Sequence, residues 1–352
     1  MAIRWAESFD YYGFTETNMS DGLWSSALGT LTTSFARTGT HSYRPTTADS
    51  ANRRIFGDDL TTFGMGFALY LTALPVLNTT NYFVFWASEG ANGAFSQFTI
   101  NITSTGTVQV RNHYQSGPIV AESAQGVITA ETHQHIEFKA TVGNTGSIEV
   151  RVNGVTVINE ASVDLLYYEA NPTVAQFGMS RATSGDGSGT YIDDLIMWDT
   201  TGSGNNDFIG DKRVFTLFPD GNTAQADFSV VGAASGYEAI DEADPDDDTT
   251  YIYEDTTGSP APSSEFTLDD LPAGAANIVA VIPVVRAQKD EAGDANLTVG
   301  LVSGASEVNG ADNPMTTEWT YRADVFETDP ATGAAWTPTA VDAVQLKLAR
   351  TL

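Results

Sequence analysis

Two adjacent aspartates stand in an otherwise apolar stretch, YIDDLIMWD at 191–199. Charged side chains are costly to bury unless they are paired or bind a metal ion. In a regular strand, neighbouring side chains point to opposite faces. The pattern therefore places Asp193 and Asp194 on different sides and argues against a catalytic pair, unless a β-bulge turns both toward one site. We expect at most one of them, Asp193, to hold the N-terminal segment in place.

A second candidate is the HxH pair His133 and His135, which shares the polar face of an expected strand with Glu137. Two histidines at i and i+2 suit a transition metal. No third ligand is evident in the sequence, so we interpret this face as solvated.

An acidic segment, DPDDDTTYIYED at 244–255, has the spacing of an EF-hand calcium loop in part. Position 6 of the loop is Thr249 where that motif needs glycine, and Tyr-Ile-Tyr follows where a helix is needed. We interpret the segment as a solvated turn or a subunit contact.

An enzyme that hydrolyses glycans would show a different sequence pattern. No E-x-D-x-x-E strand, which would aim carboxylates at one sugar, occurs in the chain. We therefore predict that the protein is not an enzyme, while a glycan-degrading enzyme stays open as a further alternative.

Aromatic and polar residues in two expected strands suit sugar binding without catalysis. Trp86 lies in NYFVFWAS, and Arg111 and His113 lie in VQVRNHYQ on the face opposite Val108 and Val110. If these strands line one sheet, Trp86 could stack on a sugar while Arg111 and His113 bind its hydroxyl groups. The alternative is that Trp86 belongs to the core and Arg111 is an ordinary exposed residue.

The elements that must position these residues are strands. In HQHIEFKATV at 133–142, apolar and polar residues alternate with period two, and Asn153-Gly154 predicts a tight hairpin. Turn residues recur along the chain, which is typical of an all-β protein. Further strands are expected at 65–72, 81–88, 95–102 and 107–114.

The run TTGSGNND at 200–207 contains no apolar residue and is interpreted as a linker. It divides the chain into domains at 1–204 and 205–352, with net charges of −10 and −19. In the second domain, strands are expected at 213–219, 277–286, 295–302 and 316–327. Pro338 after Thr337 predicts one short helix within 336–344.

Composition limits the bonds that the chain can form and the partners that it can bind. The 352 residues include no Cys, which excludes disulfides, and carry a net charge of −29, which argues against nucleic acid. No apolar run is long enough to span a membrane. The N-terminus, MAIRWAESFD, lacks the apolar region of a signal peptide.

The segments HIEFKATVGNTGSIEVRVNGVTVINE and GTYIDDLIMWD resemble concanavalin A-like, LamG-type jelly-roll domains. The resemblance implies a jelly-roll β-sandwich over 1–204. It also implies a structural calcium ion, held by acidic N-terminal residues and a late-strand aspartate, here Glu7, Asp10 and Asp193. The alternative for Asp193 is that it accepts backbone N–H bonds or pairs with an arginine.

The segments FIGDKRVFTLFPDGN, YEAIDEADPDDDTTYI and TGAAWTPTAVDAVQLKL resemble the C-terminal part of structural proteins of tailed bacteriophages. The resemblance implies a virion component, assembled in the host cytoplasm, with other virion proteins as partners. We expect the jelly roll to be displayed outward, and the second, mainly-β domain to anchor it or to form a homo-oligomer. The alternative is an adhesin that binds host surface polysaccharide through the jelly-roll sheet.

Overall fold

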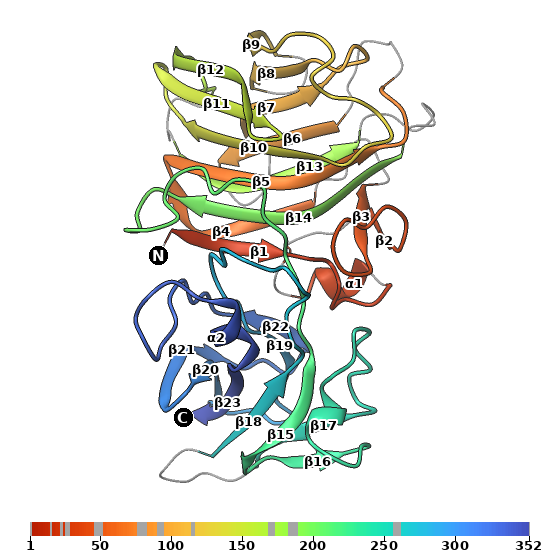
Figure 1. Cartoon of the computed structure of the whole chain (residues 1–352), viewed down its shortest axis with the longest axis vertical. Helices are drawn as coiled ribbons and strands as arrows, with labels where there is room; N and C mark the ends of the chain where they lie inside the picture. The colour runs from red at the N-terminus through yellow and green to blue at the C-terminus, as the bar shows by residue number, and fades with distance from the viewer. Residues whose placement is uncertain are drawn as a thin grey trace. The chain divides into compact units, whose positions relative to one another are not determined.

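Antiparallel strands make up most of the computed structural model of the chain (Figure 1). The structure describes residues 2–14, 16–21, 24, 29–45, 52–75, 83–89, 95–113, 117–167, 173–181, 189–255 and 262–351. No helix in these ranges is long and apolar enough to cross a membrane.

The chain divides into two compact units. Unit 1 comprises Met1–Asp10 and Phe14–Val214, and unit 2 comprises Tyr11–Gly13 and Phe215–Leu352. This division falls after Val214, later in the chain than the linker interpretation of 200–207 places it. The reason is that residues 207–214 form hydrogen bonds and ion pairs with strands of unit 1.

One sheet of unit 1 has eight strands in the order β12-β11-β10-β5-β14-β3-β2, with β1 also paired to β14. A four-residue helix, α1 (Glu16–Met19), follows β1. The strands are β1 (Ile3–Glu7), β2 (Gly29–Thr32), β3 (Ser42–Pro45), β5 (Thr62–Leu71), β10 (Gln134–Thr141), β11 (Gly146–Val152), β12 (Val155–Val163) and β14 (Thr190–Asp199).

The other sheet of unit 1 has six strands in the order β4-β13-β6-β7-β8-β9. They are β4 (Asn52–Leu60), β6 (Phe83–Glu89), β7 (Phe95–Ile102), β8 (Val108–Asn112), β9 (Ile119–Glu122) and β13 (Val174–Arg181).

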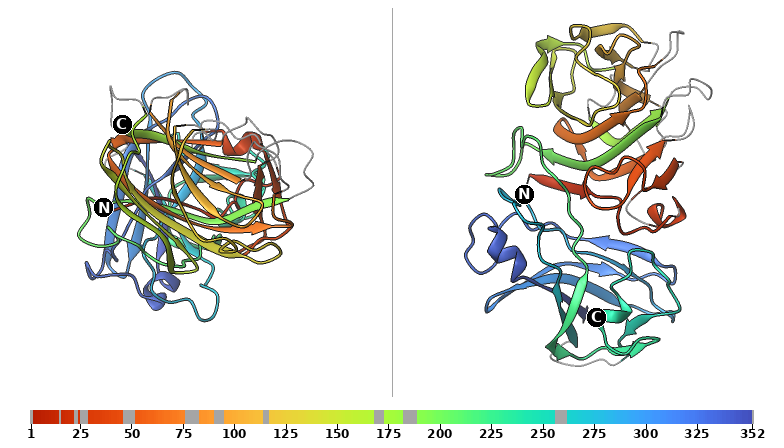
Figure 2. Two further views of the ribbon diagram at one scale, coloured as in Figure 1. Left: turned by 90° about the horizontal axis from the view of Figure 1, so that it is seen from above. Right: turned by 45° about the vertical axis from the view of Figure 1, so that its right-hand side comes forward.

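The two sheets of unit 1 form the layers of a sandwich (Figure 2). Phe98 of the six-stranded sheet packs edge-on against Phe138 and tilted against Phe63, both of the eight-stranded sheet, with ring centroids 6.5 and 6.2 Å apart. All three rings are buried. The predicted jelly-roll β-sandwich is confirmed.

The predicted turn at Asn153-Gly154 is also present. Its residues have φ values of 51° and 79°, the left-handed conformation that a two-residue hairpin needs at both positions. The turn joins β11 to β12 and so sets their pairing register.

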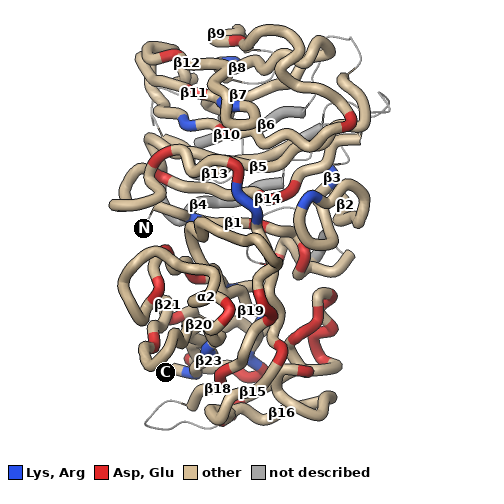
Figure 3. The backbone as a smooth tube through the Cα atoms, in the orientation of Figure 1, with Lys and Arg blue, Asp and Glu red and all other residues tan. Residues whose placement is uncertain are grey.

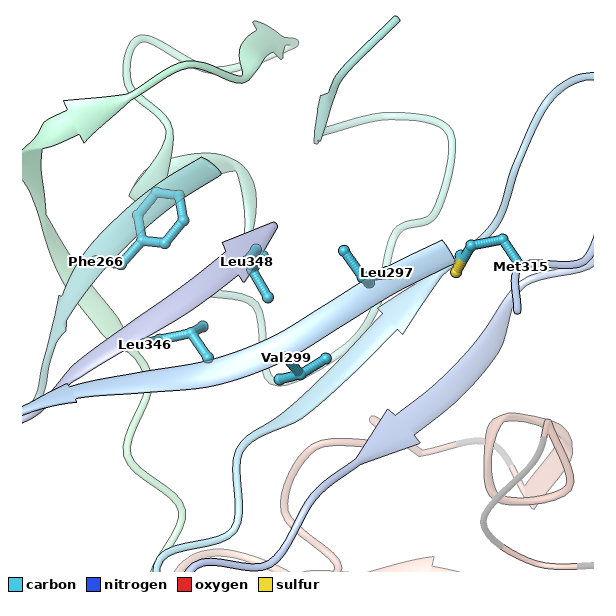
Figure 4. Packing of buried hydrophobic residues seen from close by; sticks show 6 residues of the cluster. All are labelled: Phe266, Leu297, Val299, Met315, Leu346 and Leu348. Atoms are coloured by element: carbon cyan, nitrogen blue, oxygen red, sulfur yellow. The ribbon is translucent and has the colours of Figure 1, made fainter. Parts of the chain in front are cut away.

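Unit 2 is mainly β. Its five-stranded sheet has the order β15-β18-β23-β20-β21, and two strand pairs, β16-β17 and β19-β22, accompany it. Buried side chains of Phe266, Leu297, Val299, Met315, Leu346 and Leu348 form one core cluster (Figure 4). The strands are β15 (Pro219–Ala226), β16 (Ser229–Val231), β17 (Tyr251–Tyr253), β18 (Ser263–Leu268), β19 (Val284–Ala287), β20 (Asn296–Ser303), β21 (Ser306–Pro314), β22 (Thr320–Ala323) and β23 (Gln345–Thr351).

The short helix of unit 2 is α2 (Pro338–Asp342), which confirms that prediction. The Thr337 side chain caps it by accepting the N–H of Ala340 at 3.1 Å. A one-turn 3-10 helix, η1 (Tyr237–Ala239), lies earlier in the unit.

The predicted strand at 213–219 is wrong, because β15 begins only at Pro219. Backbone donors that a neighbouring strand would have paired are taken by carboxylates. Asp194 accepts the N–H of Val214 at 2.8 Å, and Asp269 accepts that of Phe218 at 3.3 Å. The apolar run at 213–219 therefore does not mark a strand.

Candidate functional site

A β-bulge lies at the paired aspartates. Along β14, Asp193 pairs with Ala68 and Ile196 with Gly66, so β14 advances by three residues while β5 advances by two. The extra residue allows Asp194 to adopt a φ of 51°. The expectation that Asp193 and Asp194 point apart is therefore wrong, because the bulge interrupts the strand alternation on which it rested.

Both aspartates bind the loop at 37–41. One carboxylate oxygen of Asp193, Oδ2, accepts the N–H groups of Arg37 and Thr38 at 2.6 and 3.0 Å. Asp194 Oδ2 accepts the Thr38 hydroxyl at 3.0 Å and lies 3.4 Å from the guanidinium of Arg37. Both carboxyl groups are buried. The pair acts as a clamp on this loop.

A third carboxylate holds the other end of the loop. Asp10 Oδ1 accepts the N–H groups of Thr40 and His41 at 2.8 and 2.9 Å. Gly39 lies between Thr38 and Thr40 and has a φ of 62°. A Cβ at this position would lie only 1.9 Å from Asp10 Oδ2. Only glycine satisfies both the backbone conformation and the close approach.

The three candidate calcium ligands are thus engaged by protein donors. Besides Asp10 and Asp193, the buried Glu7 accepts the Phe9 N–H at 3.0 Å and the indole N–H of Trp24 at 3.1 Å. Across the described ranges, no group of three or more His, Asp or Glu is placed to hold a metal ion. Calcium at these residues stays a prediction.

The electrostatics of the clamp follow from burial. Burial and the neighbouring Asp194 raise the pKa of Asp193 to about 8. Burial also raises the pKa of Asp194, against the hydrogen bonds from Val214 and Thr38 and the positive charge of Arg37. Two buried carboxyl groups this close cannot both ionise cheaply, so one of them keeps its proton near neutral pH.

Residues 207–214, which we call the strap, cover part of the outer face of the eight-stranded sheet. Asp207 pairs with Lys139 at 2.9 Å, and Glu137 Oε1 accepts the N–H groups of Ile209 and Gly210 at 2.8 and 3.0 Å. The Arg151 guanidinium lies 3.6 Å from the ring centroid of Phe208.

The strap overturns the interpretation of the HxH face as solvated. His135 and Glu137 are 4 % and 1 % exposed. Burial lowers the pKa of His135 to about 4, so the ring is neutral at pH 7. The sequence contained no signal for this, because the residues that cover the face lie some seventy positions farther along the chain.

Two of the three residues predicted to bind glycan, Trp86 and Arg111, lie in one row across the six-stranded sheet. Trp86 pairs with Thr99, and Thr99 pairs with Arg111, so the three positions lie side by side on neighbouring strands. Of Trp86 the structure describes only the backbone. The row lies on the face opposite Phe98 and Ile100, whose side chains point into the sandwich.

Arg111 is partly buried at one end of this row. Its guanidinium donates to the Gly117 carbonyl at 2.7 Å and to Gln109 Oε1 at 2.9 Å. Its Nε is buried and has no hydrogen-bond partner within the described part of the chain. Burial lowers the pKa of Arg111, although the group stays charged at neutral pH.

His113 lies just beyond β8, with a φ of 67°. Its ring stacks on that of Tyr167, with centroids 3.4 Å apart and planes 9° from parallel. Tyr167 is 48 % exposed, and its backbone N–H donates to Gln97 Oε1 at 3.0 Å. Tyr167 was missed in the sequence because it lies far from His113 along the chain, in a segment without strand periodicity.

Several other polar side chains on this face are buried. Gln97, Thr99, Asn101 and Gln176 are all buried, although they point away from the apolar core. Gln97 also donates to the Thr173 carbonyl at 3.4 Å. Among the side chains that the structure describes here, the exposed aromatic ring is that of Tyr167, and Arg111 and His113 add hydrogen-bonding groups.

No family model and no curated relative matches the chain. Solved structures do match. Alginate lyase Aly36B is 12% identical, with 55% of this chain and 96% of that chain covered and a TM-score of 0.37. An endo-β-1,4-glucuronan lyase from Trichoderma reesei is 14% identical, with 56% and 96% covered and a TM-score of 0.37. The Emp46p carbohydrate recognition domain is 9% identical, with 54% and 94% covered and a TM-score of 0.36.

By name, these structures are two polysaccharide lyases and one carbohydrate recognition domain. Nothing in the comparisons points to a phage virion protein. The prediction that the protein is not an enzyme is contradicted, since lyases are among the structures with a similar fold. The missing E-x-D-x-x-E pattern argues against one kind of glycosidase only.

Proposed function

We propose that unit 1 binds a polysaccharide at the edge formed by Arg111, His113 and Tyr167. The observation that carries the proposal is the exposed Tyr167 ring, held flat on His113, which follows Arg111 by two positions in the chain. Binding sites for small polar ligands combine aromatic surface with a few fixed polar groups. A pyranose presents an apolar face of C–H groups and a rim of hydroxyl groups, which this combination matches.

The surrounding contacts hold the edge in shape. Gln97 fixes the backbone of Tyr167, and Gln109 and the Gly117 carbonyl fix two nitrogens of Arg111. Groups that are already ordered lose little conformational entropy when a ligand arrives. The proposed site therefore needs little rearrangement to bind.

The test is a titration of the full chain with soluble polysaccharide fragments, neutral and acidic. Tyr167→Ala is expected to weaken binding at least tenfold, which corresponds to about 1.4 kcal/mol. Tyr253→Ala is the matched control, because Tyr253 of unit 2 is a similarly exposed tyrosine. Equal affinity of the two variants would contradict the proposal.

A second candidate function is cleavage at the same edge, favoured by the stacking of the His113 imidazole on the phenol ring of Tyr167. In a polyuronate, Arg111 would neutralise the carboxylate of the sugar. His113 would then take the proton from the carbon next to that carboxylate. The glycosidic oxygen would leave with a proton from Tyr167, and a carbon–carbon double bond would form in the sugar. Ultraviolet absorbance from that double bond tests the candidate, and its absence with every acidic polymer would exclude it.

The resemblance of 205–352 to phage structural proteins supports a more specific proposal. In it, unit 1 is displayed on a tailed-phage particle and the polysaccharide belongs to the host surface. Antibody labelling of intact particles under the electron microscope tests this location. Unlabelled particles would contradict the virion assignment and leave saccharide binding untouched.

A further inference from the structure

We propose that the outer face of the eight-stranded sheet carries a second saccharide-binding surface, formed by the rings of Phe35, Tyr70 and Tyr191 with Arg44 and His133 beside them. This goes beyond the function proposed above, because it lies on the other sheet of the sandwich and shares no residue with the first site. All five side chains are described by the structure.

Strand pairing brings two of the rings together. Tyr70 of β5 is paired directly with Tyr191 of β14, and their ring centroids lie 6.3 Å apart. Both alternate with core residues, Leu69 and Ile192, so they lie on the outer face of the sheet. The Arg44 guanidinium lies 5.7 Å from the Tyr191 ring centroid.

Phe35 covers this pair from a loop. Its ring stacks on Tyr70 with a centroid distance of 4.1 Å and an interplanar angle of 17°, and it lies 4.8 Å from Tyr191. Its other side faces outward, since Phe35 is 39 % exposed. The result is one exposed aromatic face, that of Phe35, with Tyr70 stacked behind it and Tyr191 inclined to both.

The backbone at Phe35 is strained. Its φ is 56°, a left-handed conformation that is unfavourable for a bulky residue of this kind. A ligand-binding role would explain why an unfavourable backbone conformation presents an aromatic ring to solvent.

Polar groups adjoin the rings. His133 lies 5.0 Å from Tyr70, centroid to centroid. His133 Nδ1 and Arg44 Nε are buried and have no hydrogen-bond partner among the residues that the structure describes. Burial, together with the charges of Arg37 and Arg213, lowers the pKa of His133, so the neutral ring can both donate and accept.

This combination fits a pyranose better than a peptide or a fatty chain. The C–H face of the sugar would lie on Phe35, and hydroxyl groups would meet the imidazole and the guanidinium at the edge. An apolar partner would cover the remaining nitrogens of both side chains without offering them hydrogen bonds, which is unfavourable.

The experiment separates ligand binding from a purely structural aromatic cluster. The full chain is titrated with cellohexaose, chitohexaose and a guluronate hexamer, and its melting temperature is measured in parallel. The test variant is Phe35→Asn, because asparagine tolerates a positive φ. Phe35→Tyr keeps the ring, and Arg111→Ala removes the first site.

Phe35→Asn is expected to weaken binding of at least one hexasaccharide tenfold or more without lowering the melting temperature. Phe35→Tyr is expected to bind like the unchanged chain. The Phe35-dependent binding is expected to persist in Arg111→Ala, which distinguishes this surface from the first site. The proposal is overturned if no hexasaccharide binds, or if Phe35→Asn lowers the melting temperature while every binding curve stays unchanged.

Discussion

Asp193 and Thr38, 155 positions apart in the chain, are joined by a hydrogen bond of 3.0 Å from the Thr38 N–H to Asp193 Oδ2. The Thr38 hydroxyl is bound at the same time by the adjoining Asp194. The two aspartates thus close a loop against the last strand of unit 1, and this accounts for two acidic residues in an apolar strand without assigning them catalysis.

Gly39→Ala is expected to destabilise the protein by about 2 kcal/mol or more, because it adds a steric clash with Asp10 to the strain of a positive φ. Gly126→Ala is the matched control, with a φ of 75° and no atom within 4 Å of the added carbon. It should cost only the strain, about 1 kcal/mol. Chemical denaturation measures both, and equal losses would contradict a close contact at Gly39.

The Asp193 carboxyl group is expected to lower the free energy of unfolding as the pH rises from about 4 to about 8. The folded pKa of Asp193, about 8, is raised above its unfolded value, so the folded chain keeps a proton that the unfolded chain has lost. Raising the pH therefore favours unfolding, by at most about 1.4 kcal/mol per pH unit. Asp193→Asn should flatten this slope, whereas Asp207→Asn, at an exposed carboxyl group, should retain it.

His135 is expected to make the free energy of unfolding depend on pH in the acid range. Its folded pKa of about 4 lies below the ordinary value of 6.5, so between these pH values the unfolded chain binds a proton that the folded chain excludes. Lowering the pH therefore favours unfolding. His135→Gln should lose stability less steeply than the unchanged chain from pH 6.5 to pH 4, and parallel curves would show that His135 is protonated in the fold.

Glu137→Ala is expected to release the strap. The change leaves the N–H groups of Ile209 and Gly210 without their acceptor, at a cost of about 1–3 kcal/mol for each group that stays buried. Hydrogen exchange should accelerate at these two amides. Glu160→Ala, an exposed residue of β12, provides the control and should leave both amides protected.

Calcium is expected to raise the melting temperature if Glu7, Asp10 and Asp193 hold an ion, because a ligand that binds only the folded state stabilises it. Melting curves with calcium and with EDTA measure this. An unchanged midpoint would favour the hydrogen bonds to Thr40, Thr38 and Arg37 as the sole role of the aspartates.

Of the first proposed site, the sequence alone indicated Arg111 and His113 but not Tyr167. Period-two alternation identifies residues on one strand face, and it placed Arg111 correctly opposite Val110. Tyr167 reaches His113 because Gln97, Asn112 and Gly143 bind the segment that carries it. Such contacts have no periodic pattern in the sequence.

What the sequence determined by itself is the local part of the fold: the alternation of β10 and β11, the hairpin at Asn153-Gly154 and the capped helix at Pro338. Each depends on neighbouring residues. Tertiary structure decided the rest, including the bulge at Asp194, the strap over Glu137 and the strained Phe35 against Tyr70. These depend on which distant backbone donors and rings meet, because a bulge or a strained φ persists only where surrounding contacts compensate its cost.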